Sequence, residues 1–173
     1  FRVRQLLPRL RALAPAVEAI RARYVHLAGF DAAPPAADIE HLAALLTYGE
    51  PFEPGPAAPD AALVVAPRLG TVSPWASKAT DIARNCGLNP HRVERLVEYQ
   101  IGLQRKLIGR HQLSKSDLDA IAALLHDRMT ESVLASRDEA KALFTELTPE
   151  PLAHVDVLAG GRTPPEVARD IQE

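Results

Sequence analysis

The chain has 173 residues, 47% of them hydrophobic, and a formal net charge of −2. This length suits one domain with a real core, or one domain followed by a short second piece. Positive and negative residues are mixed along the chain, which argues against a nucleic-acid-binding protein with a basic stripe.

The same composition argues against membrane insertion and export. No apolar run approaches the roughly 20 residues that cross a bilayer, and arginines interrupt the apolar start that a signal peptide needs. The single cysteine, Cys86, excludes an internal disulfide framework and suits a reducing cytosol. We therefore expect a cytoplasmic protein without a membrane partner.

The first part of the chain predicts two helices and two strands. Apolar residues recur every three or four positions in both predicted helices, and prolines and glycines punctuate the segments between elements. The predicted elements are a helix over 1–13, a strand over 18–28, a helix over 38–48 closed by Gly49, and a buried strand over 62–66 ended by Pro67.

A third helix is predicted over 73–87. Ser73 is a good N-cap, Pro74 suits the first helical position, and Gly87 can end the helix in a left-handed conformation. Its apolar stripe is expected to comprise Trp75, Ala79, Ile82, Ala83 and Cys86. This pattern predicts that Trp75 anchors the core and that Cys86 is a buried, inert thiol.

The last predicted elements follow a clear strand over 92–103, in which Arg95 interrupts the apolar side. Ser114 and Asp117 form a capping box that opens a helix whose apolar stripe reaches Met129. Ser136 and Glu139 predict a further capped helix that ends near Leu147.

The order of elements predicts an α+β fold. We expect two pseudo-repeated α/β halves that form a small, mostly antiparallel sheet with helices on one face. Prolines and paired glycines after Thr148 mark a change of character. The predicted domains are therefore residues 1–148 and the start of a linker region over 149–173.

Residues that could carry chemistry do not form a recognisable catalytic or metal-binding pattern. The six histidines lack the helical pairing or the cysteine partners that typical zinc sites need. Neither a nucleophile with a nearby base nor a Walker A sequence can be identified. We therefore expect neither catalytic nor metal-binding residues in this chain, and no cofactor bound to it.

The segment Gly70–Lys78 allows two interpretations. A turn that leads into a helix N-terminus favours anions, and Ser73, Ser77 and Lys78 would add donors. In the second interpretation, the helix is merely capped and its polar residues form a solvated face. On the residues alone, the second interpretation is favoured.

Residues 66–88 closely resemble the signature of the N-terminal domain of phosphoribosylformylglycinamidine synthase, P-R-x-G-T-x-S-P-W-[SA]-S-K-A-T-D-I-A-x-N-C-G-L. Supporting segments occur in the same order on both sides. They include 24–26 (YVH), 46–49 (LTYG), 92–95 (RVER), 125–131 (LHDRMTE) and 155–158 (VDVL). The resemblance covers about residues 1–162. Two features depart from the family pattern. The first is the Thr163-Pro164-Pro165 run. The second is the absence of a short strand before the first helix, and this absence predicts an unpaired sheet edge.

The resemblance implies a function for a larger enzyme. That enzyme converts formylglycinamide ribonucleotide, glutamine and ATP to formylglycinamidine ribonucleotide, glutamate, ADP and phosphate in purine biosynthesis. Its synthetase domain binds ATP and magnesium, and its glutaminase domain carries a Cys-His-Glu triad. This chain corresponds to the non-catalytic domain that packs between these two partner domains and helps to organise ammonia transfer.

The resemblance therefore predicts a structural and interaction domain, inactive alone. The expected contacts with partner domains or the channel region involve Ser73, Ser77, Lys78, Thr80 and Asp81. A self-standing anion- or nucleotide-binding module that uses the helix N-terminus at Ser73 is the alternative. A free-standing enzyme has the least support.

Overall fold

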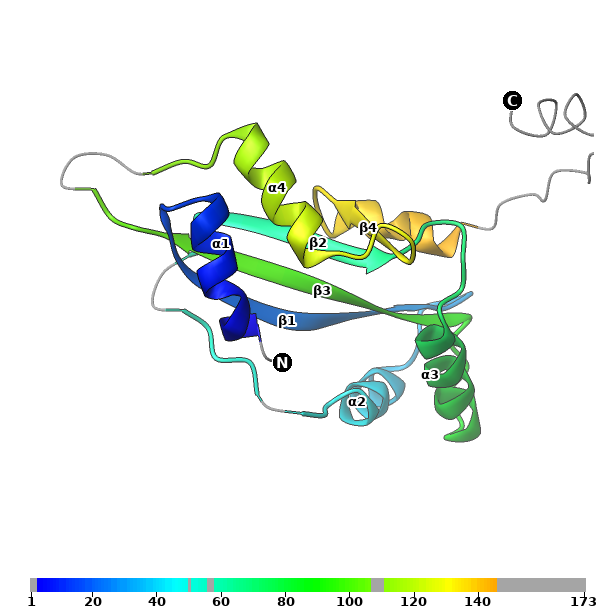
Figure 1. The fold of residues 1–173 in the computed structure, drawn as a ribbon. Helices are drawn as coiled ribbons and strands as arrows, with labels where there is room; N and C mark the ends of the chain where they lie inside the picture. Colours follow the sequence, from blue (N-terminus) through cyan, green and yellow to red (C-terminus); the bar gives the residue numbers. More distant parts are fainter. Residues whose placement is uncertain (1–2, 50, 56–57, 107–110, 146–173) are drawn as a thin grey trace, which may run out of the picture.

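The computed structural model describes residues 3–49, 51–55, 58–106 and 111–145 (Figure 1). Its elements in chain order are η1 (Val3–Leu6), α1 (Leu7–Leu13), β1 (Val17–Gly29), α2 (Ala36–Leu45), β2 (Ala61–Pro67), α3 (Pro74–Asn85), β3 (Arg92–Leu103), α4 (Lys115–Leu125), β4 (Glu131–Leu134) and η2 (Asp138–Phe144). Both η1 and η2 are 3₁₀ helices. The predicted boundary near 148 and the linker over 149–173 lie outside the described residues.

The strands form one antiparallel sheet in the order β1-β3-β2-β4. The inner strand β3 pairs with β1 from Val17 opposite Leu103 to Gly29 opposite Arg92. After η1, the order helix–strand–helix–strand occurs twice. The predicted α+β class with two α/β halves is therefore confirmed.

Both faces of β3 are covered. Tyr99 and Ile101 lie on the face that α1 and α4 cover (Figure 1), in a core cluster with Leu10, Val17 and Ile121. Leu96 lies on the opposite face, where it packs with Val64 and with Leu143 of η2. Because successive side chains of a strand alternate between faces, an inner strand covered on both sides must place most of its side chains out of water.

Helix α3 begins and ends as the sequence predicts. The Ser73 hydroxyl accepts a hydrogen bond from the backbone N–H of Ala76 at 3.0 Å, and Pro74 is the first helical residue. The chain leaves the helix through Gly87, whose φ of +83° lies in the left-handed region.

The buried side of α3 differs from the predicted apolar stripe. Ala76, Thr80 and Ala83 are its buried residues, whereas Ile82 is 48% exposed and Cys86 is also exposed. Small side chains let the helix lie close to β3, and the Thr80 hydroxyl accepts a hydrogen bond from the Val93 N–H at 2.9 Å. The prediction of a buried Cys86 is therefore wrong, because this residue follows the last helical turn and lies beyond the packed side.

The prediction for α4 is correct at its start and wrong at its end. Ser114 and Asp117 form the expected capping box. The helix ends at Leu125, however, and Met129 lies beyond it with 75% of its surface exposed. The strand β4, which the sequence analysis missed, follows and pairs Leu134 with Val64 of β2.

The predictions for α2 and η2 also need correction. Helix α2 ends at Leu45 with Leu46 as its C-cap, so Gly49 belongs to the following turn, where its φ is +77°. At η2 the N-cap is Arg137 without a side-chain cap, and Ser136 does not cap the helix. Glu139 instead accepts a hydrogen bond from the Ala135 N–H at 3.0 Å. The predicted end near Leu147 lies outside the described residues.

A proline-containing segment over 51–55 lies against the outer strand β1. The Arg23 guanidinium lies over the Phe52 ring, 5.3 Å from its centroid. Gly55 lies so close to Arg21 that a Cβ there would be 2.6 Å from a guanidinium nitrogen. Both contacts are with arginine side chains of β1, so the segment lies beside the outer strand without pairing with it in the described residues.

Thr80→Val tests how α3 is held on β3. Valine keeps the shape of threonine but removes the oxygen that accepts from the buried Val93 N–H. We expect the free energy of unfolding in urea to fall by about 1–3 kcal/mol, the usual cost of an unpaired buried donor. Thr71→Val is the matched control, because the Thr71 hydroxyl is exposed, and we expect it to cost within about 0.5 kcal/mol. Equal losses in both variants would refute this role of Thr80.

Candidate functional site

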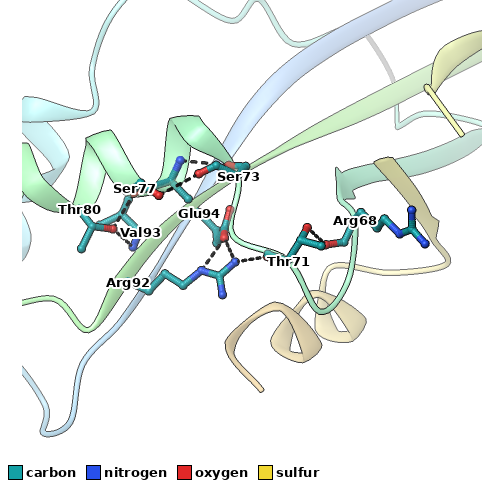
Figure 2. A network of polar contacts seen from close by, with 9 residues as sticks. Arg68, Thr71, Ser73, Ser77, Thr80, Arg92, Val93 and Glu94 are labelled. Atoms are coloured by element: carbon teal, nitrogen blue, oxygen red, sulfur yellow. Dashed lines mark hydrogen bonds and ion pairs between the residues drawn. The ribbon is translucent and has the colours of Figure 1, made fainter. Parts of the chain in front are cut away.

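The residues predicted to meet partner domains lie on different sides of α3. Ser77, Thr80 and Asp81 line a polar pocket of about 520 Å³ together with the turn before α3 and the end of η2. Lys78 lines a separate groove between α2 and α3. Thr80 is buried against β3, and Ser73 caps the helix (Figure 2). Three of the five predicted residues therefore share the polar pocket, whereas Lys78 and Ser73 do not line it.

The N-terminus of α3 already uses its side-chain groups internally. The Ser73 oxygen accepts from Ala76, and the Ser77 hydroxyl donates to the Ser73 carbonyl at 3.3 Å. Because Lys78 lines the groove and not the polar pocket, its charge does not join these two hydroxyls. The described geometry thus favours a capped structural helix over an anion site built from Ser73, Ser77 and Lys78.

A buried ion pair fixes the turn before α3. Arg92 donates from Nε to an oxygen of Glu94 at 2.6 Å and from Nη2 to the Thr71 carbonyl at 2.7 Å (Figure 2). Thr71 in turn donates its hydroxyl to the Arg68 carbonyl at 2.7 Å. The turn is therefore tied to β3 through a side chain that the sequence analysis did not single out.

Glu94 is a fully buried carboxylate on the inner strand β3. Its side chain is 0% exposed, and its second oxygen has no hydrogen-bond partner among the described residues. Burial raises the pKa of Glu94, and the hydrogen bond and charge of Arg92 oppose that rise. The alternating pattern of β3 does not predict that Glu94 is buried, because a glutamate in an alternating strand normally faces solvent.

Glu98, the second glutamate of β3, is held by three side chains. Arg23 of β1 donates to it at 2.9 Å, Gln100 donates at 2.9 Å, and Arg137 pairs with its other oxygen. Burial alone would raise the pKa of Glu98, but the bonds from Gln100, Arg137 and Arg23 outweigh burial and lower it. This cluster connects β1, β3 and the start of η2 on the face opposite α1 and α4.

An aromatic cluster, comprising Tyr24, His26, Tyr48, Trp75 and Arg95, lies beside α3. The His26 ring stacks on the half-buried Trp75 at a centroid distance of 5.6 Å. The Arg95 guanidinium lies 4.6 Å from the Trp75 centroid and 4.5 Å from that of Tyr24. Arg95, which interrupts the apolar pattern of β3, is thus accommodated by the faces of two rings.

Tyr48 connects α2 to this cluster. Its hydroxyl lies 2.9 Å from Nε2 of His26 and accepts from Arg95 at 3.3 Å. Burial, and then the charge of Arg95, lower the pKa of His26. Trp75 also packs against a core cluster with Leu42 and Val93, so its predicted role as an anchor is correct, although its ring is only half-buried.

The described residues contain no group of three or more histidine, cysteine, aspartate or glutamate side chains placed to hold a metal ion. None of the helices in the described ranges combines the length and apolarity that crossing a membrane requires.

Arg92→Met tests the buried ion pair. The variant leaves Glu94 without its cation, and we expect a loss of about 3–5 kcal/mol in unfolding free energy near neutral pH. Removing Arg92 also removes the hydrogen bond and the charge that oppose the rise in the Glu94 pKa, so Glu94 of the folded variant should take up a proton at a higher pH than in the wild type. The loss should therefore shrink as the pH is lowered in urea denaturation, because protonation removes the unpaired buried charge.

The control for that experiment is Arg84→Met, which removes hydrogen bonds to the Pro90 and His91 carbonyls without leaving a buried charge unpaired. We expect it to cost about 0.5–1.5 kcal/mol, with little change between these pH values. A loss in Arg92→Met that stays constant with pH would show that Glu94 does not depend on Arg92.

The titration of His26 tests the aromatic cluster. The folded pKa lies below the unfolded value of about 6.5, so the folded state disfavours the proton. Its contribution to stability is present above about pH 6.5 and is lost as the pH falls through the folded pKa. Arg95→Gln should move the His26 pKa upwards in an NMR titration, whereas Lys78→Gln should leave it in place. A larger change in Lys78→Gln would contradict the assigned cause.

A comparison with known families agrees with this sequence signature. The family model described as the N-terminal part of formylglycinamide ribonucleotide amidotransferase matches residues 23–144. The matched range includes the second half of β1 and all of α3 and β3, with the aromatic cluster and the buried ion pair. The chain belongs to the formylglycinamide ribonucleotide amidotransferase N-terminal family.

Proposed function

We propose that this chain is the structural and interaction domain of an enzyme that makes formylglycinamidine ribonucleotide. In that reaction, a carbon–nitrogen ligase uses ATP and takes the nitrogen of glutamine to convert formylglycinamide ribonucleotide. The family match over residues 23–144 is the observation that carries the proposal. The enzyme would act in the cytoplasm, in purine biosynthesis.

The division of labour within the enzyme is part of the same proposal. The ATP- and magnesium-binding site belongs to a synthetase domain, and ammonia is released from glutamine in a glutaminase domain. This chain contributes to neither site and positions the two domains instead. The hydrogen bonds of three polar residues support the proposal. Ser73 and Thr80 hold α3 in place, and Arg92 holds the turn before it, so these groups have structural roles.

The polar pocket beside α3 is the proposed contact with the channel region. Asp81 is exposed at its rim and Ser77 lies one helical turn earlier. A partner domain placed here would meet the helix side that is not packed on β3. The position suits a surface that aligns two domains during ammonia transfer.

Asp81→Arg in the intact enzyme tests this role. We expect the rate of formylglycinamidine ribonucleotide formation with glutamine to fall roughly tenfold, equivalent to about 1.4 kcal/mol. The rate with added ammonium salt should be retained, because free ammonia bypasses the transfer between domains. Asp119→Arg on α4 is the matched control, since Asp119 is an exposed helical aspartate too.

Two results would contradict the proposal. If the intact protein failed to form the product from formylglycinamide ribonucleotide, glutamine, ATP and magnesium, the assigned reaction would be wrong. If this chain alone hydrolysed glutamine, or bound ATP or phosphate in calorimetric titration, the non-catalytic role would be wrong. Binding lost in Lys78→Ala would then favour the anion-binding alternative.

A further inference from the structure

Helix α2 buries little of its apolar surface in the described structure. Among the described residues of α2, only Leu42 is buried. By contrast, Ile39 is 54% exposed and Leu45 is 36% exposed. An amphipathic helix normally turns such residues towards a core. The apolar side of α2 is therefore only partly satisfied by the contacts within the described residues.

The exposed Leu45 of α2 adjoins apolar residues of α3. A groove of about 220 Å³ separates the two helices, which lie side by side at one end of the sheet (Figure 1). Its lining is Leu42, Leu45, Leu46, Tyr48, Trp75, Lys78, Ala79, Ile82 and Ala83. Contiguous apolar surface of this kind, rimmed by a polar residue, is typical of a protein–protein contact.

The aromatic residues of this groove are held in place before any partner arrives. Tyr48 contacts His26 and Arg95 through its hydroxyl, and the Trp75 ring contacts both the His26 ring and the Arg95 guanidinium. Rigid tyrosine and tryptophan side chains bind partners at a low cost in conformational entropy. The groove thus combines an apolar floor with preorganised anchors.

The charges around the groove select the partner. Lys78 is the only charged residue that lines it within the described ranges. A wider adjoining groove, which shares Leu46 and Tyr48, is lined by Arg21 and by Arg23, which pairs with Glu98, against one acidic residue, Glu53. This positive excess complements a surface that carries carboxylates.

We propose that the α2–α3 groove binds an apolar segment of the remaining amidotransferase that presents a carboxylate to Lys78. This inference rests on the proposed function and names the partner surface. A second copy of the chain is a poorer occupant, because a twofold contact would place each groove, with its Lys78 and positive surroundings, against the same groove. Like charges would then meet across the contact.

Site-specific photo-crosslinking in the intact enzyme tests this proposal. A benzoylphenylalanine replaces Ile82 in one variant and Leu45 in another, so that each wall of the groove carries a probe. The control probe replaces Leu13, an apolar residue of α1 that is 43% exposed. Circular dichroism confirms that each variant is folded before irradiation, and mass spectrometry of the crosslinked peptides identifies the contacts.

We expect the Ile82 and Leu45 probes to join one common segment, beyond residue 173, that contains aspartate or glutamate. The Leu13 probe should not join this segment. Lys78→Glu should reduce the yield at both groove positions at least fivefold, and Lys115→Glu, on α4, should not. Sensitivity of the yield to added salt would agree with a charged contact.

Several outcomes would overturn the proposal: crosslinks between two copies of the chain, crosslinks confined to residues 1–173, no crosslinks from either groove probe, or a yield unaffected by Lys78→Glu. The crosslinks are read independently of catalysis. An enzyme that makes the product but shows no groove contact would therefore refute this inference alone, whereas an enzyme that does not make the product would refute the proposed function.

Discussion

The seating of α3 on β3 is the constraint on which the other features depend. The hydroxyl of Thr80 occupies the contact and satisfies the Val93 N–H, which could not reach water. Alanines on either side of Thr80 permit the close approach. Because one side of α3 is fixed in this way, its two flanks face the polar pocket and the α2–α3 groove.

Charged residues of β3 extend this constraint into the sheet. Glu94 lies fully buried and depends on Arg92, which also holds the turn before α3. Glu98 ties β1 to the start of η2 through two arginines. Buried ion pairs add little net stability compared with apolar packing, but an unmatched member is costly. Their effect here is to fix the positions of the turn and of η2.

Much of the fold could be predicted from the sequence because local signals and packing agree. Serine caps, prolines and Gly87 define α3, and alternation defines β3. The sequence could not reveal β4, since four residues are too few for alternation to be distinguished from the helical pattern before them. The buried side of α3 was also missed, because alanine and threonine resemble surface residues until their contact with β3 is known.

The candidate site also has features that the sequence predicts and features that it does not. The signature sequence covers α3, but it does not show that Ser77 and Asp81 line the polar pocket whereas Lys78 lines the groove. The aromatic cluster required the pairing of β1 with β3, which sets His26 opposite Arg95. That register depends on contacts between residues far apart in the chain, so no local pattern encodes it.

Hydrogen exchange of the folded chain tests the central claim most directly. If α3 is an anchored scaffold, the backbone amides of Thr80 and Ala83 should exchange only in the global unfolding that also exposes Val93 in β3. Amides of the less buried α2 should exchange through smaller openings. Exchange of the α3 amides by local opening, while the β3 amides stay protected, would contradict the account.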